Sequence, residues 1–275
     1  LPDGRLAVCT WDQIGAVYDL TGREQVFASY SENMALPRGA DAVFSAASPT
    51  VPAPEAETAK NWELGVRTNR PTFNASFVLY QTKFANRLQS FASTVPGSTT
   101  TETFFQNVGE VDAYGAEFSG QWKPDLFAGK VYFNGNLSYN HAEFQDNYTT
   151  VVNGVPTIVP IAGKIVPDFP EWVAQAGVTF EPTDWALFNI SARHISDRYT
   201  NFINSEKTDG YTVWNAYMDI GQLGEGPLSR LKFRLNVDNI FDEDYLGTIT
   251  TTTTTLATFR PGPPRSVQLT LSAEF

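Results

Sequence analysis

The sequence predicts an all-β protein: an antiparallel transmembrane β-barrel, of which this chain supplies about eleven strands. Segments in which apolar and polar residues alternate recur along the chain, and the connections between them alternate between short and long. Charged residues make up 18% of the 275 residues, below the ~25% usual for soluble domains. No apolar stretch approaches the ~18 residues of a membrane helix, which leaves a barrel as the membrane-spanning alternative.

Each strand is predicted to have one apolar and one polar face, because successive side chains of a strand point to opposite sides. The last strand is the clearest case, with Val267, Leu269 and Leu271 on one face and Gln268 and Thr270 on the other. The predicted strands span approximately residues 13–20, 24–34, 59–69, 72–84, 111–123, 128–142, 171–181, 185–196, 211–222, 228–239 and 264–275.

The connections carry the strongest fold signal. Five are tight turns rich in Gly, Pro, Asn and Asp, and five are long polar loops. Short periplasmic turns and long extracellular loops make this alternation necessary in an outer-membrane barrel, whereas a soluble Greek-key sandwich, the alternative fold, does not need it. The long loops span roughly residues 35–58, 85–110, 143–170, 197–210 and 240–263.

Five tryptophans lie close to predicted strand ends. Indole rings favour the headgroup level of a membrane, so we expect two belts. The alternative is that these large aromatics fill a core. With the long loops outside, the outer belt would contain Trp62, Trp172 and Trp214, and the inner belt Trp122 and Trp185.

Composition and motifs argue against several other classes of protein. The net charge of −11 disfavours nucleic-acid binding, which needs a basic surface. The single cysteine, Cys9, excludes an internal disulfide, and no metal-ligand spacing or phosphate-binding glycine loop is present. We expect no cofactor and no enzyme activity. His194 shares a face with apolar residues, and His141 has only Glu143 nearby, which does not make a catalytic site.

An odd number of strands is unexpected for a finished bacterial barrel. An open sheet would leave unpaired backbone groups in lipid, each costing about several kcal/mol. The chain also starts at Leu1 without a recognisable signal peptide. We therefore expect residues 1–275 to be the C-terminal part of a larger barrel protein.

Short motifs spread over the chain resemble those of the TonB-dependent outer-membrane receptor family, in the same order. In the motif near the C-terminus, Ile240 replaces the usual leucine. The motifs are FASYSE at 27–32, Pro54-Glu55 followed by NWELG at 61–65, YGAE at 114–117, LNVDNIFD at 235–242 followed by Tyr245, and PGPPR at 261–265 before the terminal Phe275.

The resemblance implies a barrel of about 22 strands closed by an N-terminal plug, with this chain as its second half. It implies location in the cell outer membrane of a Gram-negative bacterium, in contact with lipid, and contact with the TonB complex through the N-terminal region. The implied function is active uptake of a small ligand, in first place a ferric siderophore. Cobalamin, haem or an oligosaccharide are alternative cargoes. A passive porin, a soluble binding module and an outer-membrane hydrolase are alternatives of other classes.

Two groups of candidate functional residues follow. Polar residues of the inner face either bind the plug or only solvate the wall. Loop residues are candidates for ligand recognition, because binding groups concentrate on loops held by a rigid scaffold, and a cationic or aromatic rim would attract an anionic ferric chelate. The plug-facing candidates are Glu63, Arg67, Glu117, Lys232, Arg234 and Asp238. The loop candidates are Arg87, His141, Tyr148, Lys164, Arg198, Tyr199 and Arg260.

Two further stretches are interpreted as structural. Asp238, Asn239 and Asp242 are expected to hydrogen-bond the backbone where a strand ends, as such residues do in turns. The threonine run at 250–255 is expected to extend strands above the membrane, because β-branched residues favour extended backbone.

Overall fold

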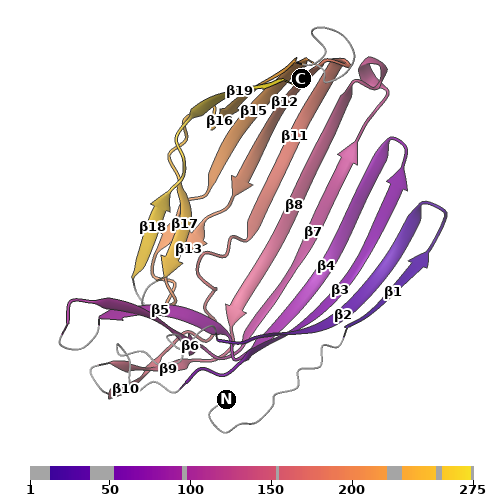
Figure 1. The fold of residues 1–275 in the computed structure, drawn as a ribbon. Coiled ribbons are helices and arrows are strands. Elements are labelled where there is room, and N and C mark those ends of the chain that lie inside the picture. The colour runs from indigo at the N-terminus through magenta and orange to yellow at the C-terminus, as the bar shows by residue number, and fades with distance from the viewer. Residues whose placement is uncertain are drawn as a thin grey trace.

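The computed structural model describes residues 13–37, 53–94, 98–152, 155–221, 231–251 and 256–273. Eleven long strands form one antiparallel sheet, in which each strand pairs with the next long strand along the chain (Figure 1). The predicted strand number and meander topology are therefore confirmed. The strands are β1 (Gln13–Asp19), β2 (Glu24–Ala35), β3 (Glu57–Arg70), β4 (Phe73–Ala85), β7 (Val111–Trp122), β8 (Val131–Phe144), β11 (Trp172–Thr183), β12 (Ala186–Ile195), β15 (Tyr211–Gly221), β16 (Leu231–Asp238) and β19 (Ser266–Ala273).

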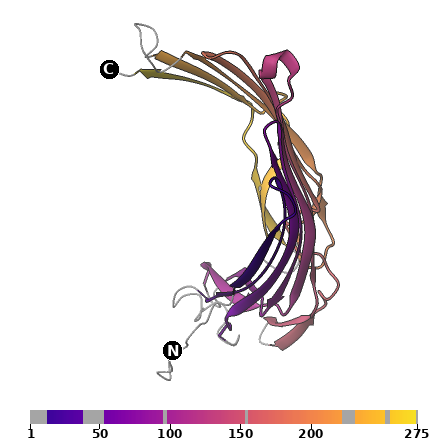
Figure 2. The ribbon, with the colours of Figure 1, turned by 90° about the vertical axis from the view of Figure 1, so that its right-hand side faces the viewer.

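The sheet is strongly curved and does not close (Figure 2). Its outermost strands, β1 and β19, each pair with one long strand only, β2 and β16. The short turns that the structure describes lie at one end of the sheet, and the described parts of the long loops lie at the other (Figure 1); we call these the short-turn end and the long-loop end. The arrangement is that of part of a barrel wall, as expected, and the total of about 22 strands stays a prediction.

The two faces of the sheet have the polarity that the alternation predicts. On the apolar face, Leu235 of β16 lies directly opposite Met218 of β15 and Leu269 of β19. On the polar face, Arg234 lies opposite Asp219. Because strand side chains alternate, this register assigns every residue of the eleven strands to one face.

The polar face is the concave one. Hairpin β5–β6 (Leu88–Thr94 and Thr101–Asn107) lies toward the concave side of the sheet (Figure 2). Its Phe91 belongs to the same buried cluster as Ala113 of β7, and Ala113 shares a face with Glu117, four residues further along that strand. The convex face is therefore the apolar one that a membrane would contact.

The five tryptophans of the predicted belts are all exposed. Toward the long-loop end, Trp172 contacts Tyr139, with 5.0 Å between ring centroids, and Trp214 contacts Phe241 at 6.1 Å. Toward the short-turn end, Trp122 stacks on Phe133 at 5.5 Å. These rings do not fill a core, which removes the alternative explanation for them.

The long loops contain more structure than the sequence predicts. Four of them, predicted as long polar loops, each contain a small hairpin. The short connection before β8 contains a single tight turn, η1 (Leu126–Gly129), in which Phe127 and Ala128 have left-handed backbone. Besides β5–β6, the hairpins are β9–β10 (Tyr148–Val152 and Val155–Val159), β13–β14 (Arg198–Tyr199 and Lys207–Thr208) and β17–β18 (Leu246–Thr251 and Ala257–Pro261). Thr250 and Thr251 extend β17 as expected, whereas residues 252–255 lie outside the described part.

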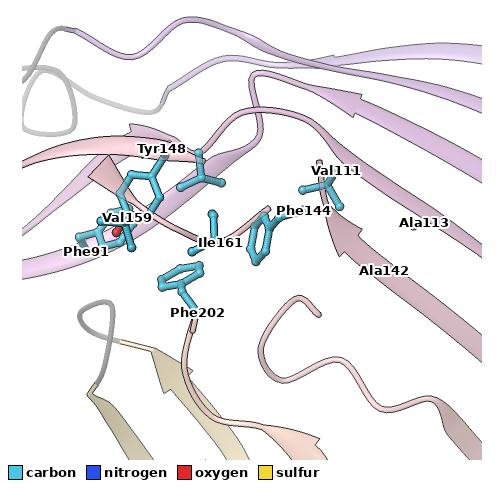
Figure 3. Close-up of a cluster of buried hydrophobic side chains, with 10 residues drawn as sticks. Phe91, Val111, Ala113, Ala142, Phe144, Tyr148, Val159, Ile161 and Phe202 are labelled. Atoms are coloured by element: carbon cyan, nitrogen blue, oxygen red, sulfur yellow. The ribbon is translucent and has the colours of Figure 1, made fainter. Parts of the chain in front are cut away.

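A buried apolar cluster lies at the long-loop end and joins the sheet to these hairpins (Figure 3). Val111, Ala113, Ala142 and Phe144 supply its sheet side, where the concave face changes from polar to apolar. The loops supply its other side: Phe91, Val108, Tyr148, Val159, Ile161 and Phe202. Among the described residues, no helix has the length and apolar character required to cross a membrane.

Candidate ligand site at the long-loop end

The loop hairpins form a fixed platform because their aromatic rings pack around Phe202. The Phe202 ring lies 5.4 Å from Phe91, 5.7 Å from Phe144 and 6.3 Å from Tyr148, between centroids, as Figure 3 shows. Tyr148, a predicted ligand contact, is 4% exposed, and this burial raises the pKa of its phenol. Its position places it in the platform, where it holds loops together.

Arg198 connects three loops from a buried position. Its guanidinium donates to the Asp168 carboxylate at 2.7 Å and to the Leu246 carbonyl at 2.6 Å, and it is 5% exposed. Burial raises the pKa of the Asp168 carboxyl, and the charge of Arg198 opposes that rise. The guanidinium thus holds the three loops together, and its candidate role as a ligand contact stays a prediction.

Arg87 is held in a similar way. Its guanidinium donates to Glu57 at 2.6 Å and lies over the Phe84 ring, 4.6 Å from the centroid. The second oxygen of Glu57 accepts the Leu88 amide at 2.7 Å. This ion pair attaches the start of the β5–β6 loop to strand β3.

His141 lies on the opposite face of β8 from Phe144 of the platform. It belongs to the apolar face of β8, opposite Tyr114, whose ring is 4.9 Å from the imidazole. Its ring nitrogens lie 3.4 Å from a Glu143 oxygen and 3.8 Å from a Glu171 oxygen. This position faces outward at the long-loop end rather than into the concave side.

The remaining loop candidates differ in surroundings. Tyr199 has the Lys207 ammonium 4.5 Å from the centroid of its ring. That ammonium also pairs with Asp197 at 2.6 Å. Lys164 contributes backbone bonds, its carbonyl accepting the Phe144 amide at 2.9 Å. Arg260 is exposed on β18.

A cavity of about 940 Å³ lies where hairpins β13–β14 and β17–β18 meet β15. Tyr211, Tyr245 and Phe259 contribute aromatic rings to its wall, and the Tyr211 and Tyr245 centroids are 4.3 Å apart. Burial raises the pKa of the Tyr245 phenol. The other lining residues are Thr200, Glu206, Lys207, Thr208, Asp209, Gly210, Glu243, Asp244, Leu246, Pro261 and Gly262.

Sequence reasoning did not find this cavity. Tyr199 and Arg198 lie on the hairpin that borders it, but the lining residues themselves were not candidates. Tyr245 was recognised only as part of a motif, and Glu243 and Asp244 were not singled out. The pairing of two loops that are distant in the sequence creates the cavity, so no local pattern predicts it.

The polar face carries the predicted inner-wall residues. Lys232 and Arg234 both contact Asp219, with shortest N–O distances of 3.1 and 2.6 Å. Their candidate role as plug contacts stays a prediction. For the other four, Ser29 donates to Glu63 at 3.0 Å, Arg67 donates to Gln25 at 2.6 Å, Ser266 donates to Asp238 at 3.4 Å, and Glu117 lies opposite Val78.

In the turn after β16, Asn239 and Asp242 have the structural role expected for them, whereas the hydrogen bond found for Asp238 joins it to the Ser266 side chain and not to backbone. Asn239 and Asp242 both have left-handed backbone, with φ of 51° and 57°. The Asn239 side chain accepts the Glu243 amide at 2.8 Å and donates to the Pro263 carbonyl at 3.2 Å. Asp242 accepts the Arg265 amide at 2.8 Å. These bonds connect the end of β16 to the segment that leads into β19.

Residues 13–240 match the family model described as TonB dependent receptor-like, beta-barrel. The chain belongs to the TonB-dependent receptor β-barrel family. This match covers most of the sheet, including the strands that carry the motifs at 27–32, 61–65 and 114–117.

Solved TonB-dependent receptors have the same fold. The siderophore receptor PiuA from Acinetobacter baumannii is 17% identical, with 95% of this chain and 35% of that chain covered and a TM-score of 0.72. The ferric citrate transporter FecA, unliganded, is 20% identical, with coverage of 96% and 38% and a TM-score of 0.72. The copper transporter OprC is 15% identical, with coverage of 96% and 39% and a TM-score of 0.71.

These comparisons identify the family of the chain but not the cargo of the whole protein. The present chain spans just over a third of the length of each of these receptors. TonB-dependent receptors are transport receptors, and their barrels are outer-membrane proteins. Because the cargoes named for the three structures differ while the fold is the same, the fold does not identify the cargo.

Proposed function

We propose that this chain forms part of the barrel wall of an outer-membrane receptor that takes up a ferric siderophore with energy supplied through TonB. The observation that carries the proposal is the combination of a barrel wall of this family with a cavity on its long-loop end. The lipid-facing apolar convex surface and the exposed tryptophans toward its two ends suit insertion in a bilayer.

The cavity supports a binding role. Its volume of about 940 Å³ lies within the range of ~300–1,000 Å³ typical of small-molecule sites. Aromatic rings and charged side chains line it together. The platform around Phe202 and the Arg198–Asp168 pair hold neighbouring loops in place, which lowers the entropic cost of ordering them on binding.

Among the loop candidates, we propose exposed Arg260 and half-buried Tyr199 for direct contact with the ligand, and half-buried Lys164 for a peripheral one. Arg87, Tyr148 and Arg198 support the loops instead, each through the contacts described above. His141 faces outward on the convex side, where it would meet the membrane interface.

The test is transport by the full-length protein in a Gram-negative host that lacks its own ferric-siderophore receptors. We expect the protein in the outer-membrane fraction and uptake of radioactive iron from at least one ferric hydroxamate, catecholate or citrate chelate. Uptake should disappear in an otherwise identical host without TonB. A control strain carrying the empty vector measures background uptake.

Each other outcome favours a different candidate. Uptake that continues without TonB would identify a passive porin. TonB-dependent uptake of cobalamin, haem or an oligosaccharide, without ferric chelates, would keep the transport class and refute the siderophore. Protein found only in the soluble fraction would refute the whole proposal.

A further inference from the structure

The cavity between hairpins β13–β14 and β17–β18 is acidic. Glu206, Asp209, Glu243 and Asp244 line it and are exposed. In the part of the chain that the structure describes, no ion pair involves any of these four carboxylates. Several like charges around one concave surface attract a ligand of opposite charge.

The nearby cations do not neutralise this surface. Lys207 is the one basic side chain among the described lining residues, and it pairs with Asp197 at 2.6 Å outside the lining set. Arg198 lies beneath the Tyr211 ring, 5.7 Å from its centroid, with its guanidinium bound to Asp168. The charge of Arg193 opposes the rise in the pKa of the Tyr245 phenol, but Arg193 is not among the residues that line the cavity.

The wall also offers groups that suit an organic cation. The paired rings of Tyr211 and Tyr245 present aromatic surface, over which ammonium groups bind favourably. Thr200 and Thr208 line the same cavity and are 2% and 9% exposed, and their hydroxyl oxygens have no hydrogen-bond partner among the described residues. Unsatisfied buried hydroxyls are costly, so a ligand that reaches them through a small adjustment of the wall would gain affinity.

A bare metal ion fits the cavity less well. Within the described ranges, no three His, Cys, Asp or Glu side chains come close enough together to hold a metal. Metal ions need converging ligands at short distances, whereas dispersed carboxylates beside aromatic rings match a larger ion with diffuse charge.

We propose that this acidic cavity binds the positively charged arm of a cationic ferric chelate, one that carries a pendant ammonium group. The inference rests on the proposed transport function and adds the charge class of the cargo. It reverses the expectation of an anionic chelate attracted by a cationic rim. Two of the arginines on which that expectation depended, Arg87 and Arg198, are already paired with carboxylates, and the third, Arg260, is not among the residues that line the cavity.

The test measures binding to the purified full-length receptor in detergent by quenching of tryptophan fluorescence. The probes are three forms of one ferric trihydroxamate: with a free ammonium, with that amine acetylated and neutral, and with it succinylated and anionic. The ammonium form should bind about tenfold more tightly than the acetylated form, since several exposed carboxylates each contribute a few-fold. Added salt should reduce the difference.

Two variants connect the effect to the cavity. The double variant Glu206→Gln with Asp244→Asn keeps side-chain size and exposure, and should bring the affinities for the ammonium and acetylated forms close together. The double variant Glu110→Gln with Asp184→Asn removes two exposed carboxylates outside the cavity lining; it is the matched control and should leave the difference unchanged.

The outcomes separate this inference from the proposed function. Equal or tighter binding of the acetylated or succinylated form overturns the inference, as does binding of none of the three. If any of these results came with TonB-dependent uptake of an anionic ferric chelate, the inference would fall and the proposed function would stand. Loss of the preference in the control double variant as strongly as in the cavity double variant would assign the effect to net charge and overturn the cavity as its site.

Discussion

Leu235→Arg tests the facing of the sheet most directly, because it puts a charge at the middle of the apolar face. Leu235 lies opposite Met218. Residues 214 to 218 span about 13 Å and residues 218 to 221 about 10 Å, at ~3.3 Å per residue. Trp214 marks one belt, and the Gly221 amide donates to the carbonyl of Trp185 in the other. Leu235 therefore lies close to midway between the belts.

At this depth an arginine costs about 2–4 kcal/mol in a transmembrane barrel. The loss of the Leu235 contacts with Met218 and Leu269 acts in the same direction. We expect the free energy of unfolding of the full-length receptor in lipid vesicles, measured by denaturant titration, to fall by that amount. Less assembled protein should also reach the outer membrane.

Asn236→Arg is the control one position along the same strand. Asn236 lies on the polar face, opposite Tyr217 and Gln268. Its replacement should change the free energy of unfolding by no more than about 0.5 kcal/mol, as is usual at solvated positions. Equal effects at positions 235 and 236 would refute the assignment of the two faces, and so would a larger effect at 236.

Three further predictions concern the loops and the turn after β16. Arg198→Ala removes hydrogen bonds to Asp168 and Leu246, and should lower the local stability by about 2–3 kcal/mol; hydrogen exchange in β17 should rise, and unchanged protection would contradict the structural role. Phe202→Ala opens the aromatic platform at a cost of about 3–5 kcal/mol, so limited proteolysis should cut the loops faster while the strands stay protected. Asn239→Ala loses the side-chain bonds and strains a backbone with φ of 51°, costing about 2 kcal/mol. Asn239→Gly should recover part of this, because glycine tolerates that φ; equal loss of unfolding free energy in both variants would show that the backbone conformation does not matter.

Much of the fold follows from local sequence, and particular segments show why. Val267, Leu269 and Leu271 alternate with polar residues, and this pattern of period two assigns their face without any knowledge of neighbouring strands. The short turn at 182–184 and the long segment at 197–210 predict the direction of the meander by their lengths. The role of Asn239 was also predictable, since its side chain bonds to backbone only a few residues away.

The candidate site was less predictable. Arg198 and Tyr148 have residue types that suit ligand binding, and nothing local shows that one is paired with Asp168 and the other buried beside Phe202. The hairpins inside the long loops were missed because their strands are short and only weakly alternating. The apolar end of the concave face, from Ala142 to Phe144, carried a signal in the sequence, a change from polar to apolar along one face.

The sequence by itself determined the strands, their two faces, the order of short and long connections and the family resemblance. Each of these depends on residues within a few positions of one another or on connection length, so it can be found along the chain. Only the tertiary structure decided which loop residues are buried and where the cavity lies. Phe202 meets Phe91, and Tyr245 meets Tyr211, across long stretches of intervening chain. Such contacts form because the curved sheet brings the loops together. A pattern of neighbouring residues along the chain does not show which distant loops will meet.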